Sequence, residues 1–391
     1  MEKLKVRISV RNLVEFILRS GDLDNSRGSS GDKGAMLKGG RLHRKIQRSM
    51  KGNYQAEVSL KRESEYEDVI IQVEGRADGI FTEDGEFWID EIKGTYGNLQ
   101  AMEVPVPVHR AQAMCYGWIY GEKEGLSQIG IQMTYSHLDT EDTRRFREIF
   151  SMEELKNWYQ KLLDDYHKWI SCSLSWKKER NASMKDLQFP FPYREGQREI
   201  VSGVYHTVSS KKTLFVQAPT GVGKTMSAIF PSVRAIGEGK GETLFYLTAK
   251  TITGTVAWEA FHTLRENGLK FKVTAITAKE KLCFLDSPEC TPEKCPYAKG
   301  HFDRVNDAVY ELWTTEEVYS REVIRAHAEK WQVCPFEMCL DLSVWVDGVI
   351  CDYNYAFDPN VHLKRFFGEN ISGDYIFLID EAHNLVERGR E

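Results

Sequence analysis

The sequence predicts two α/β domains in tandem, the second of which is built on a parallel sheet. In the second half, short and almost continuously apolar runs alternate with helical segments, as expected for strands covered on both faces of a sheet. A glycine-rich turn follows the first of these runs, and two acidic residues follow the last. In the first half, two longer runs joined by turn residues predict neighbouring strands.

Length and composition limit the class of protein. The 391 residues are enough for two or three domains, and 41% hydrophobic with 28% charged residues is ordinary for a globular chain. A net charge of -6 neither favours nor excludes nucleic acid, because a whole-chain sum can hide a basic groove. No apolar run approaches bilayer length and no signal peptide begins at Met1, so we expect a cytoplasmic protein without a membrane partner.

In the first domain, residues 21–40 are rich in Gly, Ser and Asp and predict a mobile loop. Strands are expected at 69–81, 86–95 and 129–136, and helices at 42–50, 109–120 and about 152–170. The polar stretch 176–186 is interpreted as the domain boundary, which gives domains 1–185 and 186–391.

In the second domain, strands are expected at 213–217, 243–248, 272–276, 348–351 and 375–379. This alternation of strands and helices is an α/β nucleotide-binding layout.

Residues 218–225 (APTGVGKT) fit the phosphate-loop pattern, except that Ala218 replaces the glycine of its simplest form. Gly221 and Gly223 would let backbone N–H groups approach phosphates at the N-terminus of the next helix. Lys224 can reach the β and γ phosphates of ATP, and the Thr225 hydroxyl can bind Mg²⁺. The loop residues expected to contact ATP are Thr220, Gly221, Val222, Gly223, Lys224 and Thr225.

Residues 380–383 (DEAH) directly follow the predicted strand 375–379. An acid at the carboxyl end of a parallel strand lies where open α/β sheets bind ligands. Asp380 is expected to hold Mg²⁺, and Glu381 to orient and deprotonate the attacking water. Alone, this sequence could also be a solvated acidic turn.

The order of these motifs resembles superfamily 2 helicases. Residues 191–197 (FPYREGQ) resemble the adenine-recognition segment of that group, with Gln197 as its glutamine, and residues 246–251 resemble its segment that contacts the DNA backbone. The resemblance implies that His383 couples the nucleotide to the DNA-binding side.

Six of the eight cysteines lie between the 246–251 segment and the DEAH residues, and four of them are the candidate metal ligands. These four are Cys283, Cys290, Cys295 and Cys334. Four thiolates at irregular spacing suit a 4Fe–4S cluster. Zn²⁺ is an alternative, although the paired CxxC spacing is missing, and buried free cysteines are the third interpretation.

Residues 334–336 (CPF), 349–359 (VICDYNYAFDP) and 380–384 (DEAHN) resemble the XPD/DinG-like iron–sulfur helicases. The resemblance implies a RecA-like domain with an iron–sulfur insertion over about 278–340, Cys334 as the fourth ligand, and 5′-to-3′ unwinding of DNA. Cys351 is expected in the core, and Cys339 is the main rival ligand.

Asp78, Glu91 and Lys93 form a second candidate site. Residues two apart on a strand project from the same face, so Glu91 and Lys93 can converge beside Asp78. Two carboxylates can bind Mg²⁺ or Mn²⁺, and the lysine can position or activate water for phosphodiester cleavage.

This arrangement resembles the RecB-like PD-(D/E)XK nucleases. The resemblance adds His43 as an upstream metal ligand and Gln112 with Tyr116 as a pair on one helix face. A hairpin with exposed charges and a degenerate nuclease fold that only binds DNA remain alternatives.

Together these features predict an ATP-dependent DNA helicase fused to a metal-dependent DNA nuclease, acting in DNA repair or processing on single-stranded or forked DNA. The expected cofactors are ATP, Mg²⁺, a 4Fe–4S cluster, and Mn²⁺ or Mg²⁺ at the nuclease site. Alternatives are a nuclease or DNA-binding module whose ATPase half only regulates DNA access, and a DNA-binding module without enzymatic activity.

The chain ends eight residues after His383, so a second RecA-like lobe is expected to be absent. The chain is therefore predicted to bind nucleotide weakly and not to unwind DNA alone, with the missing lobe supplied by the rest of a longer protein.

Overall fold

The computed structural model describes residues 3–25, 33–50, 52–219, 221–249, 251–368 and 371–390. It forms two compact units, Met1–Ser171 and Cys172–Glu391. The division therefore falls inside a long helix, α4 (Met152–Lys185), rather than at residue 185.

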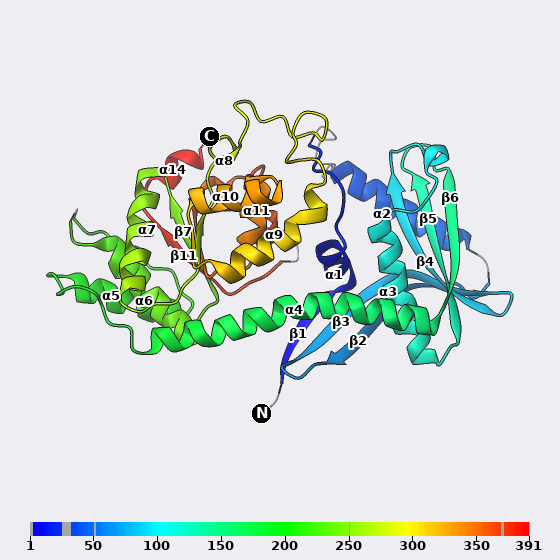
Figure 1. Cartoon of the computed structure of the whole chain (residues 1–391), viewed down its shortest axis with the longest axis horizontal. Coiled ribbons are helices and arrows are strands. Elements are labelled where there is room, and N and C mark those ends of the chain that lie inside the picture. Colours follow the sequence, from blue (N-terminus) through cyan, green and yellow to red (C-terminus); the bar gives the residue numbers. More distant parts are fainter. Residues whose placement is uncertain are drawn as a thin grey trace. The chain divides into compact units, whose positions relative to one another are not determined.

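The described residues of the first unit form a six-stranded mixed sheet (Figure 1). Its strands are β1 (Leu4–Ser9), β2 (Gln55–Glu65), β3 (Val69–Glu83), β4 (Glu86–Thr95), β5 (Gln128–His137) and β6 (Thr143–Ser151). The order is β1-β3-β4-β5-β6, with β2 also paired to β3. β1–β3 and β4–β5 are parallel, and the other pairs are antiparallel. The helices are α1 (Val10–Ile17), α2 (Lys33–Ser49), the short 3-10 helix η1 (Leu99–Ala101), α3 (Pro107–Glu124) and the first part of α4.

The hairpin of β3 and β4 confirms the two strands expected in this region. Asp84 and Gly85, which connect them, have φ angles of 52° and 86°, the left-handed conformation that a tight hairpin turn requires. The ladder pairs Glu83 with Glu86 at the turn and ends at the pair Gly79–Asp90. The predicted elements at 109–120, 129–136 and 152–170 are also present as α3, β5 and α4.

One sequence prediction in this unit is wrong. Residues 33–40 belong to helix α2 instead of a loop, because Leu42 and Ile46 of the same helix are buried against Ile92 and hold it in place. In the second unit, the polar stretch 176–186, where the domain boundary was expected, is helical through Lys185, because its Lys, Arg, Glu, Met and Ala residues are strong helix formers.

The described residues of the second unit form a five-stranded sheet in the order β11-β7-β10-β8-β9, with every pair parallel. The strands are β7 (Thr243–Thr248), β8 (Val273–Ala275), β9 (Val318–Tyr319), β10 (Gly348–Asp352) and β11 (Tyr375–Ile379). The helices are α5 (Gln197–Ser209), α6 (Lys224–Gly237), α7 (Thr251–Glu266), α8 (Lys279–Leu282), α9 (His301–Thr315), α10 (Arg321–Trp331), α11 (Pro335–Leu342), α12 (Asn354–Phe357), α13 (Lys364–Phe367) and α14 (Asn384–Arg388).

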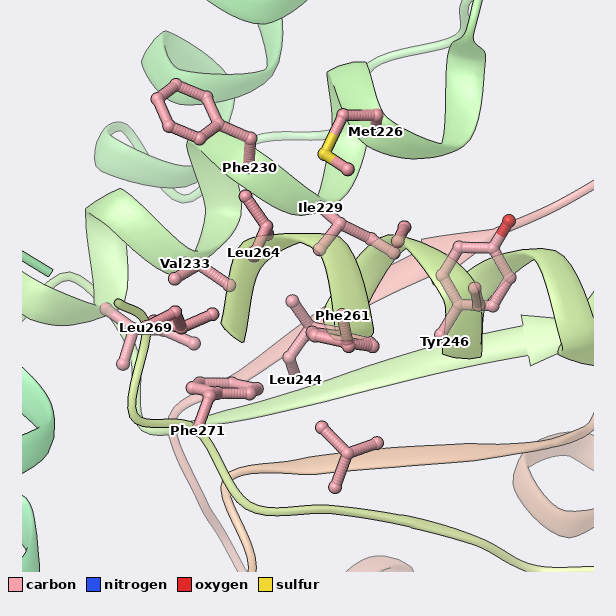
Figure 2. Packing of buried hydrophobic residues seen from close by; sticks show 14 of the residues in the cluster. Met226, Ile229, Phe230, Val233, Leu244, Tyr246, Phe261, Leu264, Leu269 and Phe271 are labelled. Atoms are coloured by element: carbon pink, nitrogen blue, oxygen red, sulfur yellow. The ribbon is translucent and has the colours of Figure 1, made fainter. Parts of the chain in front are cut away.

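The core of this unit lies between β7 and the helices α6 and α7. Figure 2 shows Ile229 of α6 on the side of the helix that faces Leu244 of β7 and Phe261 of α7. Burying each such side chain contributes about 1.5–3 kcal/mol. This packing fixes the start of α6 relative to the carboxyl end of β7, where the predicted phosphate loop lies.

The strand expected at 213–217 is not formed. Phe215 is 87% exposed and its neighbours Leu214 and Val216 are also exposed. An apolar run becomes a strand only where a neighbouring strand supplies hydrogen-bond partners. Within the described residues, the ladder of β11 is with β7, and 213–217 pairs with no strand.

None of the helices in the described ranges is both long and apolar enough to cross a membrane.

Candidate functional site

Asp78 lies where β3 and β4 separate, one residue beyond the last ladder pair of the two strands. Its Oδ2 accepts a hydrogen bond from the Ile92 backbone N–H at 2.7 Å, so the side chain replaces a strand partner. Its Oδ1 lies 3.6 Å from Nδ1 of His43 on α2. Burial lowers the pKa of His43, but the hydrogen bond and charge of Asp78 outweigh burial and raise it overall.

Glu91 and Lys93 share one face of β4, as their spacing predicted. The Lys93 Nζ lies 2.8 Å from the Glu91 Oε1. Burial raises the pKa of Glu91 to about 7, because the cation of Lys93 offsets only part of the cost of desolvation and the charge of Asp78 adds to it. The carboxylates and the lysine therefore interact in one site.

Helix α3 contributes the other two predicted residues. The ring of Tyr116 packs against Gly75 of β3, where a Cβ atom would lie 2.6 Å from its hydroxyl, so only glycine permits this approach. The charges of Glu91 and Asp78 contribute to the raised pKa of Tyr116, after burial as the main cause. Gln112 is buried. The structure therefore brings Tyr116 into the site.

Unpaired buried oxygens at this site are suited to binding a divalent cation. Among the described residues, Glu91 Oε2 and Gln112 Oε1 are buried oxygens without a hydrogen-bond partner. Burying an oxygen without a partner costs free energy unless a cation or a hydrogen-bond donor binds it. The same residues do not form a finished coordination sphere, since no described group of three or more His, Cys, Asp and Glu side chains is arranged to hold a metal ion.

His109 gives this unit a pH-dependent stability. Burial, with the charges of Lys93 and Arg11, lowers its pKa to about 4, and its Nδ1 lies 3.2 Å from the Tyr135 hydroxyl. Below about pH 6.5 the imidazole of His109 becomes protonated in the unfolded chain but stays neutral in the folded chain. The free energy of unfolding therefore falls as the pH drops from 6.5 toward 4. The loss should approach roughly 3 kcal/mol. Urea unfolding between pH 6.5 and 4 should show that the free energy of unfolding depends less on pH in His109→Gln than in the wild type. An equal pH dependence in the two proteins would contradict the role given to His109.

The predicted phosphate loop precedes α6, and Thr220 lies outside the described residues. Gly221 and Gly223 both have a φ of 83°, which favours glycine, and Gly223 caps α6 without a side-chain hydrogen bond. No side chain of Gly223 therefore caps the first backbone N–H groups of α6, and these groups can bind an anion. The Lys224 Nζ donates to the Ala218 carbonyl at 3.0 Å.

Gln197 is buried and attached to this loop. Its Nε2 donates to the Val222 carbonyl at 2.9 Å, and its Oε1 accepts from the Arg194 N–H at 3.0 Å. The Arg194 guanidinium also donates to the Gly221 carbonyl. The segment before α5 therefore holds the backbone of the loop.

The acidic residues after β11 lie close to the loop. Burial and the charge of Glu381 raise the pKa of Asp380, while Lys224 lowers it, so the ammonium and the carboxyl are near enough to interact. Glu381 has a φ of 48° and its Oε2 lies 3.4 Å from the His383 Nδ1. The structure thus brings together residues from two distant parts of the sequence.

Sequence reasoning missed two tyrosines at this site. The Tyr246 hydroxyl at the end of β7 lies 3.5 Å from the Thr225 Oγ1 and also interacts with Asp380. The Tyr353 hydroxyl donates to the Asp380 backbone carbonyl. Their positions at or just after the carboxyl ends of β7 and β10 were the available signal.

The cysteines are all free thiols, and two of the four predicted ligands interact with the side chain of Lys279. Cys283 follows α8, which begins at Lys279, and the Lys279 ammonium interacts with both Cys290 and Cys334. Burial raises the pKa of Cys334 to about 11 although it begins α11, whose backbone N–H groups lower it. Cys295 is buried.

The two other cysteines of this region lie in the core of the sheet. The Cys339 Sγ is 3.7 Å from the Thr274 Oγ1 of β8, and Cys351 is buried in β10, as expected.

Comparison with known proteins finds a family match near the C-terminus and several relatives that match part of the chain. The DEAD_2 family model matches residues 263–391. A probable ATP-dependent helicase of Methanocaldococcus jannaschii is 40% identical over 201 residues, which are 51% of this chain and 29% of that protein. The Gallus gallus homologue of Fanconi anemia group J protein is 33% identical over 82 residues, 21% of this chain and 6% of its own length.

A solved XPD helicase structure has a TM-score of 0.34 and 18% identity, with 50% of this chain and 34% of that chain covered. The chain spans less than a third of the length of the two curated relatives. Residues 263–391 are therefore similar to the DEAD_2 family, and about half of the chain is similar to part of a probable ATP-dependent helicase.

Proposed function

We propose that the C-terminal half binds and hydrolyses ATP as the first RecA-like, ATP-binding domain of an XPD-like DNA helicase. The observation that carries this proposal is that β7 contacts both motifs: the Tyr246 hydroxyl lies 3.5 Å from the Thr225 Oγ1, and the Asp380 N–H donates to the Leu247 carbonyl at 3.0 Å. The similarity of residues 263–391 to the DEAD_2 family supports it.

The residues have distinct tasks in this proposal. The N–H groups at the start of α6 and the Lys224 ammonium bind the phosphates, while Thr225 and Asp380 hold Mg²⁺. The bound Mg²⁺ supplies neutralisation of phosphate charge. Glu381 orients and deprotonates the attacking water, and His383, beside it, transmits the state of the nucleotide toward DNA.

The test is phosphate release from ATP by the purified protein with and without single-stranded DNA. Hydrolysis that needs Mg²⁺ and rises with DNA supports a helicase motor. Nucleotide binding without any response to DNA would instead indicate an ATPase half that does not act on DNA. The 5′-to-3′ polarity and the role in DNA repair or processing remain predictions from the resemblance.

We further propose that Cys283, Cys290, Cys295 and Cys334 bind a 4Fe–4S cluster in the segment 278–340. The chemistry of four thiols fits the cluster, and the backbone N–H groups at the start of α11 offset part of the burial that raises the pKa of Cys334. Residues 279–283 and 334 are connected through Lys279, which supports a common site.

Protein purified without oxygen is expected to contain about four irons per chain and to absorb visible light. A Cys→Ser change at any of the four positions should remove most of the iron, whereas Cys115→Ser and Cys172→Ser should keep it. If Cys339→Ser loses the iron and Cys334→Ser keeps it, the proposed ligand set is wrong.

A specific observation favours a second function, metal-dependent cleavage of DNA by the first unit. His43, Asp78, Glu91 and Lys93 interact in one site, and Glu91 has a buried oxygen without a donor. A divalent metal held by the two carboxylates and His43 would polarise the phosphodiester and supply a nucleophilic water. Lys93 would position that water, with Gln112 and Tyr116 shaping the site from α3.

The test of this second function is cleavage of labelled single-stranded and forked DNA with Mn²⁺ or Mg²⁺. Cutting that stops when EDTA is added supports a nuclease. No cutting by anaerobically prepared protein that still binds DNA would favour a degenerate fold that only binds.

A further inference from the structure

Helix α2 presents three different faces along its length, because successive residues turn by about 100°. Leu42 and Ile46 form the apolar face and pack against β4. His43 and Gln47 form a second face, and the Gln47 Nε2 donates to the Asp78 carbonyl at 2.9 Å. The helix is therefore fixed to the strand that carries Asp78.

The third face carries Arg41, Arg44 and Arg48, which we call the arginine stripe. With Lys45 they line a surface hollow of about 480 Å³. The three arginines are exposed, and none forms an ion pair with an acid in the described part of the chain. The neighbouring lysine differs, since Lys45 is paired with Glu141.

An exposed aromatic ring lies on the same side of α2. Tyr96, just after β4 and three residues beyond Lys93, is 48% exposed. The Lys38 Nζ of α2 lies 5.9 Å from the centre of its ring. Lys38 is itself paired with Asp139, so the cations available to phosphates are those of the arginine stripe. A surface that carries an exposed ring and such cations is one on which unpaired bases stack while their phosphates are neutralised.

We propose that the arginine stripe and Tyr96 bind single-stranded DNA and guide it to the carboxylates of Asp78 and Glu91. The stripe spans about 10 Å along the helix axis and offers three guanidinium groups, which can neutralise about three phosphates. The phosphates would also relieve the repulsion among three like charges on one helix face. The exposed ring favours a single strand over a duplex, whose bases are already stacked. The proposal rests on the proposed nuclease function, because it assigns a substrate track to that site.

The first experiment measures anisotropy of a labelled oligothymidine strand in EDTA, so that no cleavage occurs. Replacing Arg41, Arg44 and Arg48 together by Gln should lower the salt slope, d log K/d log[salt], by about 2, since each phosphate on a single strand contributes about 0.7. Tyr96→Ala should weaken binding about tenfold. A control with Lys61, Lys156 and Lys161 changed to Gln removes the same charge from exposed positions elsewhere. An unchanged slope in the arginine variant, or an equal change in the control, overturns the proposal.

The second experiment localises the strand. A single strand carrying 5-bromouracil is irradiated with the full chain, and the cross-linked peptide is identified by mass spectrometry. We expect a cross-link at Tyr96 in the wild type and in Asp78→Asn, and its loss in the arginine variant. Cross-links only outside residues 33–96 overturn the proposal. A cross-link at Tyr96 in a wild type that cuts no DNA leaves this track standing and refutes the nuclease alone.

Discussion

Replacing Glu381 by Gln is expected to lower ATP hydrolysis by about 10²- to 10⁴-fold at saturating ATP, while ATP binding is unchanged. The amide keeps the shape of the side chain but cannot accept the proton of the attacking water. Glu381 directly follows Asp380, the carboxylate proposed to hold Mg²⁺, and lies beside His383, so we propose it as the base. Phosphate release and equilibrium ATP binding measure the two effects separately.

Glu387→Gln is the matched control, because Glu387 is an exposed carboxylate on the following helix, α14. We expect it to hydrolyse ATP like the wild type. Equal hydrolysis by Glu381→Gln and Glu387→Gln would exclude Glu381 as the base.

Replacing Lys93 by Ala is expected to lower metal-dependent DNA cleavage by about 10²- to 10³-fold. Lys93 is the cation nearest to Glu91, and its charge lowers a pKa that burial otherwise raises. Its removal therefore takes away the group that positions water and also raises the pKa of Glu91 further, which opposes metal binding below neutral pH.

Lys61→Ala on β2 removes an exposed cation and should cut DNA normally. Lys93→Arg keeps the charge and should restore the pKa effect but not the full cleavage rate. Asp78→Ala should be as defective as Lys93→Ala. Cleavage that survives in all of these variants would point to a contaminating nuclease or to a different site.

Local patterns predicted most of the first unit but not its exceptions. The strands around Asp84 and Gly85 were predictable, because alternation and turn residues act within a few positions. The loop expected at 33–40 failed because Leu42 and Ile46, buried by tertiary contacts, stabilise a helix through glycines that propensity disfavours. The prediction for 213–217 was wrong in the opposite way, because a strand was expected where none forms. Its apolar residues lack a neighbouring strand among the described residues.

The candidate sites were predictable to the extent that their spacing is local. Glu91 and Lys93 share a face because they are two residues apart on a strand. The hydrogen bond from Ile92 N–H to Asp78 depends on where two strands separate, which no local pattern gives. Tyr246 was missed for the same reason, because its approach to Thr225 follows from the packing of α6 on β7.

Equilibrium binding of a fluorescent ATP analogue, with and without Mg²⁺, tests the nucleotide site most directly. We predict saturable binding that strengthens with Mg²⁺ and weakens about 10- to 100-fold in Lys224→Ala, as expected for loss of a charged contact to phosphate. Lys212→Ala, which removes an exposed cation before the loop, should bind like the wild type. The same affinity in all three proteins, or no binding by the wild type, would contradict the assignment of the nucleotide site.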